Sequence, residues 1–157
     1  MPFSPDIIVT RDGGSRILLV AEARRTKIRG EDESKLKFYM TQMRCPTGLL
    51  VTPETIGIFR DRYTGHSEES VERVGEFTAP GNWQIFKAPH HGSQTSDSRV
   101  EERFEEAVRS WLEDLSSSPS GNFAEIPKDT REALAEFVIP ALAEGVIRAG
   151  GPRFSTK

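Results

Sequence analysis

The sequence predicts an α/β protein: a mixed β-sheet with a crossover helix, followed by C-terminal helices. Two apolar runs at 5–10 and 16–23 flank a turn rich in Asp and Gly, which predicts an antiparallel hairpin. A helical stripe follows at 34–44, and two further apolar runs follow at 48–52 and 55–60. Strands joined through a helix are normally parallel with a right-handed crossover, so this sheet should contain both strand directions.

The hairpin is the most clearly marked of these elements. Ile7, Ile8 and Val9 are contiguous β-branched residues, a pattern typical of a buried strand. Gly13 and Gly14 adopt positive φ without steric cost, which suits a tight turn. The chain therefore reverses direction before the second strand begins.

The crossover helix is predicted from its apolar spacing. Ser34 is a suitable N-cap, Pro46 stops the helix, and the polar residues 26–33 around Gly30 read as a loop. The apolar stripe consists of Leu36, Tyr39, Met40 and Met43. This helix should pack one face on the sheet.

Beyond the second strand pair, residues 72–77 predict a short strand and 79–98 an irregular connection. Residues 99–115 form an amphipathic helical pattern. Asp129 caps a last helix whose inward stripe extends to Val146, and Pro140 should break or kink that helix. The expected organisation is a core over 1–88, a loop over 89–98, a helical region over 99–150 packed on the core or on a partner, and a frayed tail over 151–157.

Composition limits the class of protein. The net charge of −3 is no overall signature of a polyanion-binding protein, although residues 1–63 carry a charge of +3 and residues 64–157 a charge of −6. The single cysteine, Cys45, excludes an internal disulfide framework and a cysteine-based zinc site, and nothing pairs it with a base for nucleophilic chemistry. The N-terminus does not read as a secretory signal, and no apolar run is long enough for a membrane span. We therefore expect a cytoplasmic protein.

The hairpin also brings acids together. The start of one antiparallel strand lies beside the end of the other, so Asp6 and Glu22 should converge. Residues two apart on a strand share a face, which places Arg24 beside Glu22. Two close carboxylates repel, and a divalent metal relieves the repulsion; Mg²⁺ favours one or two carboxylates with water and substrate phosphate. Acids, metal and cation together suit phosphodiester hydrolysis.

These residues resemble a known signature. Pro5-Asp6, fifteen residues, then Glu22-Ala23-Arg24 resembles the motif of the PD-(D/E)xK nucleases, most closely the N-terminal nuclease domain of type I restriction enzyme R subunits. The resemblance covers about the first 60 residues and implies a restriction-endonuclease-like core. It implies that Asp6, Glu22 and the Ala23 carbonyl bind Mg²⁺, for which Mn²⁺ can substitute, and that DNA is the substrate.

The chain departs from that motif at two positions. Arg24 stands where the family has Lys, and Arg cannot act as a base, although it can hold a phosphate. On the helix, Lys35-x-x-x-Tyr39 stands where the family often has Gln-x-x-x-Tyr. Either Lys35 reaches the site and supplies the ammonium, or the site has decayed and Lys35 is a solvated residue.

The family's opening helix and the first strand of its meander have no counterpart before Pro5, so the chain reads as truncated. Strand 5–10 would then be an apolar edge that recruits another strand. We expect 72–77, 83–87, a second subunit or another protein partner to cover it. Three readings stay open: a Mg²⁺-dependent nuclease, a catalytically silent interaction module of the same fold, and a structural domain of other ancestry.

Overall fold

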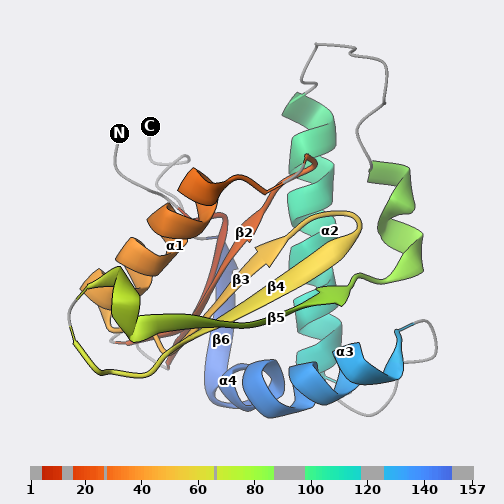
Figure 1. Cartoon of the computed structure of the whole chain (residues 1–157). Helices are drawn as coiled ribbons and strands as arrows, with labels where there is room; N and C mark the ends of the chain where they lie inside the picture. Colours follow the sequence, from red (N-terminus) through yellow and green to blue (C-terminus); the bar gives the residue numbers. More distant parts are fainter. Residues whose placement is uncertain are drawn as a thin grey trace, which may run out of the picture.

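A mixed sheet of six strands organises the computed structural model, which describes residues 5–11, 16–26, 28–65, 67–86, 98–117 and 126–149. The strands are β1 (Ile7–Arg11), β2 (Ile17–Ala23), β3 (Thr47–Val51), β4 (Thr55–Asp61), β5 (Val71–Thr78) and β6 (Gly145–Ala149). They lie in the order β5-β4-β3-β2-β1-β6. The helices are α1 (Gly30–Met43), α2 (Ser98–Ser117), α3 (Lys128–Ala133) and α4 (Ile139–Glu144) (Figure 1). Short helical turns lie at Glu68–Ser70, Gly81–Phe86 and, in π-helical form, Leu134–Val138.

The strand directions confirm the predicted α/β class. β1 and β2 are antiparallel, and α1 connects β2 to β3, which runs parallel to β2. β4 returns antiparallel to β3, and β5 returns antiparallel to β4. The hairpin, crossover helix, parallel strand and return strand thus occur in the order that the sequence predicts.

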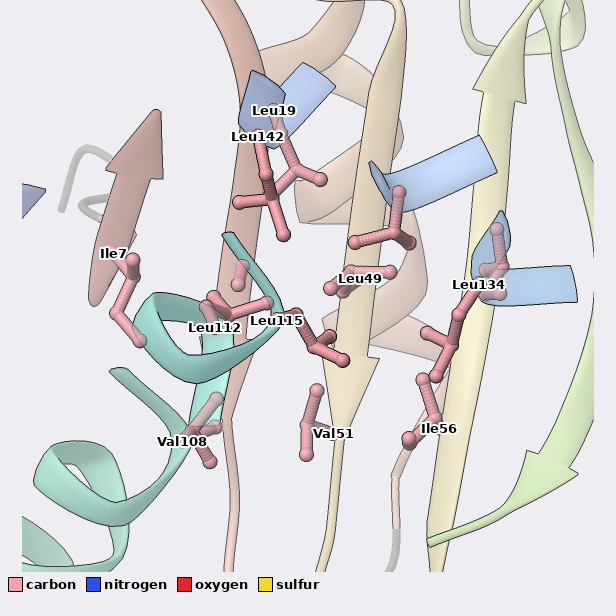
Figure 2. Packing of buried hydrophobic residues seen from close by; sticks show 14 of the residues in the cluster. Ile7, Leu19, Leu49, Val51, Ile56, Val108, Leu112, Leu115, Leu134 and Leu142 are labelled. Carbon is pink, nitrogen blue, oxygen red and sulfur yellow. The ribbon is translucent and has the colours of Figure 1, made fainter. Parts of the chain in front are cut away.

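Apolar residues bury both faces of the sheet. On one face, Leu36 and Met40 of α1 pack with Val20, Leu50 and Phe59. On the other face the longer helix α2 and the C-terminal helices cover the strands. Figure 2 shows side chains from the strands meeting those of the helices there: Ile7, Leu19, Leu49, Val51 and Ile56 against Val108, Leu112, Leu115, Leu134 and Leu142. The described parts of the regions 1–88 and 99–150 therefore share one sheet and one core.

Helix α1 begins earlier than predicted, at Gly30 and not at Ser34. The N–H of Arg29 donates to Asp32 Oδ2 at 2.9 Å, so a side chain of the first turn satisfies the backbone at the helix start. Glu31, Asp32 and Glu33 also place negative charge near the positive end of the helix dipole. These effects outweigh the glycine, and the second half of the predicted loop at 26–33 is helical.

The last helix also differs from the prediction. It ends at Glu144, and the chain turns extended at Gly145 to form β6, so Val146 is 43% exposed and not part of an inward stripe. A π-helical turn at Leu134–Val138 interrupts the α-helical hydrogen bonding just before Pro140, near the expected break. The cause is the missing N–H of proline, which cannot complete an α-helical hydrogen bond.

The edge of β1 is covered by β6 and by neither segment named from the sequence. Val9 pairs with Ile147 in an antiparallel ladder. The segment 72–77 belongs to β5, which forms a hairpin with β4 at the far side of the sheet. Residues 81–86 form a helical turn whose Trp83 packs against Phe104 and Trp111 of α2. A later segment does cover β1, as expected, and it comes from the same chain.

Some predictions fall outside the described residues. The predicted tail at 151–157 and the predicted loop at 89–98, apart from Ser98, are not among the residues that the structure describes.

Within the described ranges, every helix is too short or too polar to cross a bilayer.

Gly145 should be essential for seating β6. A Cβ at this position would overlap Val9 Cγ1 and lie 3.0 Å from the carbonyl oxygen of Thr10. Gly145→Ala is expected to lower the free energy of unfolding by about 1–3 kcal/mol, measured by urea denaturation. Gly30→Ala, where the added methyl meets nothing within 4 Å, should leave stability unchanged or raise it slightly. Equal effects of the two substitutions would contradict the tight fit of β6 on β1.

Candidate functional site

The two acids of the hairpin lie opposite each other at its open end. Ile8 pairs with Val20 and Ile7 with Ala21, and one more step in this register sets Asp6 against Glu22. Both residues are buried, with Asp6 9% and Glu22 6% exposed. The N–H of Ala23 donates to Asp6 Oδ2 at 2.8 Å and fixes that carboxylate against the second strand. The fold therefore brings together the acids that the sequence places sixteen residues apart.

Glu22 is a strongly perturbed acid. Burial raises the pKa of Glu22, the nearby Asp6 carboxylate raises it further, and the Arg24 guanidinium partly offsets both. Glu105 of α2 adds a smaller upward effect, and the pKa reaches about 8. A carboxyl group with this pKa holds a proton at neutral pH unless a cation takes its place. Such acids concentrate at functional sites.

Arg24 links this acid pair to helix α1. Its Nη2 lies 3.1 Å from Glu22 Oε2 and 3.3 Å from Asp32 Oδ1. Asp32 escaped prediction because the helix was expected to start at Ser34, which left residue 32 in a loop. The signal that could have identified Asp32 is its position three residues after Arg29, where an acid can accept the backbone N–H at the start of a helix.

The contact between Glu22 and Arg24 is incomplete. A guanidinium and a carboxylate often form two parallel hydrogen bonds, but here Glu22 Oε1 and Arg24 Nε are both buried without a hydrogen-bond partner. A buried polar atom left without a partner carries a desolvation penalty. Glu22 Oε1 is therefore an unsatisfied polar atom within the acid pair.

Lys35 lies apart from these contacts. Its Nζ forms an ion pair with Glu31 at 3.7 Å, and its side chain is 51% exposed on α1. Tyr39, one turn further on, packs against the cluster between α1 and the sheet. The cation that the structure pairs with Glu22 is Arg24.

Arg25, which sequence reasoning did not single out as a site residue, holds the opposite side of the hairpin exit. Its Nε donates to the carbonyl oxygen of Phe86 at 3.0 Å, and its Nη1 lies 3.8 Å from Glu101 Oε2 of α2. The side chain is only 10% exposed. Arg24 and Arg25, which follow the end of β2, thus anchor the exit to α1 and α2 respectively.

The donor set fits a hard cation held by few protein ligands. Asp6 and Glu22 supply carboxylate oxygens, and Glu22 Oε1 lacks a partner. Among the described residues there is no group of three or more His, Cys, Asp or Glu side chains arranged for a metal. Mg²⁺ is commonly held by one or two carboxylates and completes its shell with water and phosphate, so this pair suits Mg²⁺ better than metals that need a full protein cage. The Ala23 carbonyl stays a predicted ligand.

Cys45 is excluded as a nucleophile. It is fully buried and donates its S–H to the Thr47 carbonyl at 3.2 Å. Burial raises the pKa of the thiol to about 12, so the thiolate is essentially absent at neutral pH.

No family model, curated protein or solved structure matches this chain.

The raised pKa of Glu22 should make stability depend on pH. Between an unfolded value of 4.5 and a folded value of about 8, the folded state keeps a proton that the unfolded state releases, so the free energy of unfolding falls as pH rises. In metal-free buffer, Glu22→Gln should therefore become more stable than the wild type as pH increases from 5 to 8, by about 1–3 kcal/mol at the upper end. Chemical denaturation across this range measures the difference.

Glu72→Gln is the matched control, because Glu72 is a partly exposed acid paired with Arg60 at the β4–β5 edge of the sheet. Its stability difference from the wild type should not grow over the same interval. Parallel pH profiles for Glu22→Gln and the wild type would show that the carboxyl group titrates normally.

Proposed function

We propose that this chain is a nuclease-like domain that hydrolyses phosphodiester bonds of DNA with Mg²⁺. The observation that carries the proposal is the buried juxtaposition of Asp6 and Glu22 at the end of the hairpin, with the Arg24 guanidinium 3.1 Å from Glu22. The motif resemblance and the order of β1, β2, α1, β3 and β4 support the same assignment.

Each residue has a separate role in this proposal. Asp6 and Glu22, with the Ala23 carbonyl, would hold Mg²⁺, which when bound neutralises charge on a phosphate oxygen and lowers the pKa of water. Arg24 keeps its positive charge and presents N–H groups to phosphate oxygens, and its 40% exposed side chain makes that contact accessible. Lys35 lies on an exposed part of α1 and is the candidate for an ammonium group delivered from the helix.

A second candidate function is a catalytically silent interaction module. It is favoured by the two contacts of Arg24, whose guanidinium already lies against the carboxyl groups of Glu22 and Asp32. In that case the guanidinium permanently fills the electrostatic role of a metal. Such a module would bind a partner and turn over no substrate.

Cleavage of supercoiled plasmid DNA tests the first candidate. Purified wild-type protein should nick the plasmid with Mg²⁺ or Mn²⁺ and not with EDTA. Glu22→Gln and Asp6→Asn should each lower the rate at least about a hundredfold, because each removes a charged ligand. Glu72→Gln should retain wild-type activity, since Glu72 lies at the β5 edge, four strands from β1. Nicking that survives Glu22→Gln would exclude this site, and no nicking under any metal would favour the silent module.

Substitution of the third motif residue separates the two candidates further. Arg24→Lys introduces an ammonium group that can exchange a proton, and it removes the planar group that bridges Glu22 and Asp32. The nicking rate should rise at least about tenfold, in line with the effect of a positioned proton-transfer group. Initial rates at saturating Mg²⁺ measure this, and a fall in rate would mean that the guanidinium itself is needed.

A further inference from the structure

Arg24 is shared between a residue of the acid pair and a residue outside it. One nitrogen, Nη2, contacts Glu22 Oε2 at 3.1 Å and Asp32 Oδ1 at 3.3 Å. Any cation that binds the Glu22 carboxylate must compete with this guanidinium, because two positive charges on one carboxylate repel each other. The fate of Arg24 therefore determines how well Glu22 can accept a metal.

Asp32 is fixed in place by the start of helix α1. Its Oδ2 accepts the N–H of Arg29 at the start of α1, so its second oxygen is held toward Arg24 by the backbone of the helix. Its side chain is only 12% exposed, and the low local dielectric strengthens its attraction for the guanidinium. Asp32 is thus a fixed second acceptor.

We propose that Asp32 is the positioning residue of this site: it retains the Arg24 guanidinium when a divalent cation replaces Arg24 on the Glu22 carboxylate. This inference rests on the proposed function, because it concerns the metal affinity of the same acid pair. Without Asp32, the Arg24 guanidinium keeps only its contact with Glu22 out of these two. It then competes more strongly with the metal cation for the Glu22 carboxylate. With Asp32, the guanidinium stays next to the site, where a phosphate can meet it.

Titration with Mn²⁺, followed by the electron paramagnetic resonance of the free ion, tests the inference without requiring catalysis. Asp32→Asn keeps an oxygen acceptor for the Arg29 N–H but loses the charge that holds Arg24. Its Mn²⁺ dissociation constant should rise about tenfold, as is usual when a group supporting a metal ligand is altered. Asp32→Ser, with a shorter acceptor, should give the same result if Asp32→Asn folds poorly.

Glu31→Gln is the matched control. Glu31 lies in the same first turn of α1, and its substitution by Gln removes the same charge as Asp32→Asn. Its side chain, however, is 63% exposed and pairs with Lys35. Its dissociation constant for Mn²⁺ should stay within about twofold of the wild type, since screening weakens an exposed charge.

The Arg24→Gln background distinguishes positioning from simple charge. Arg24→Gln should tighten Mn²⁺ binding, and adding Asp32→Asn to it should then change the dissociation constant by less than about twofold, because the guanidinium to be retained is gone. An undiminished tenfold loss in this background would show that Asp32 acts directly on the ion and would overturn the inference. Equal Mn²⁺ affinities of wild type and Asp32→Asn would overturn the inference alone, whereas Mn²⁺ binding that does not depend on Glu22 would overturn both the inference and the proposed function.

Discussion

Strand β1 is hydrogen-bonded along both of its edges, to β2 on one side and to β6 on the other, and the candidate site depends on that double pairing. The pairing with β2 sets the register that places Asp6 opposite Glu22. The pairing with β6 makes β1 an interior strand, and its apolar residues Ile7 and Val9 are almost completely buried in the core beneath the helices. Asp6 directly precedes this buried strand, which is why a charged side chain lies in a dry environment at the end of the sheet.

The electrostatics of the site follow from that burial. A carboxylate removed from water needs a proton, a cation or hydrogen-bond donors. Asp6 obtains a donor from the Ala23 backbone, and Glu22 obtains part of its compensation from Arg24. The remaining deficit appears as the raised pKa of Glu22 and as its unsatisfied Oε1. The Arg24 guanidinium is divided between Glu22 and Asp32. A divalent ion would compensate the buried Glu22 carboxylate more completely.

The sequence predicted the parts of this arrangement that depend on local patterns. The hairpin follows from two β-branched runs around glycines, and α2 follows from an apolar stripe with residues such as Phe104, Val108 and Leu112 on one side. The convergence of Asp6 and Glu22 was also predictable, because hairpin register is local. These elements needed no knowledge of the rest of the chain.

What escaped prediction depends on contacts between distant segments or on competition between signals. The five residues of β6 continue an apolar helical pattern, and only the open edge of β1 makes them a strand. Asp32 was hidden because Gly30 reads as a loop residue, although the acids that follow it stabilise a helix start. Arg25 reaches Phe86 and Glu101, and neither contact has a signature in sequence spacing.

The two partners of β1 join it at very different distances along the chain. Val9 pairs with Leu19 only ten residues later, but with Ile147 it closes a loop of 138 residues. The difference in loop-closure entropy is about 2 kcal/mol, and pairings between distant segments slow folding. The hairpin that carries the acid pair can therefore form early in folding, before the last strand docks. A hairpin formed before the helices pack on the sheet would present these carboxylates as solvated acids, so the raised pKa of Glu22 is a property of the folded chain and not of the hairpin alone.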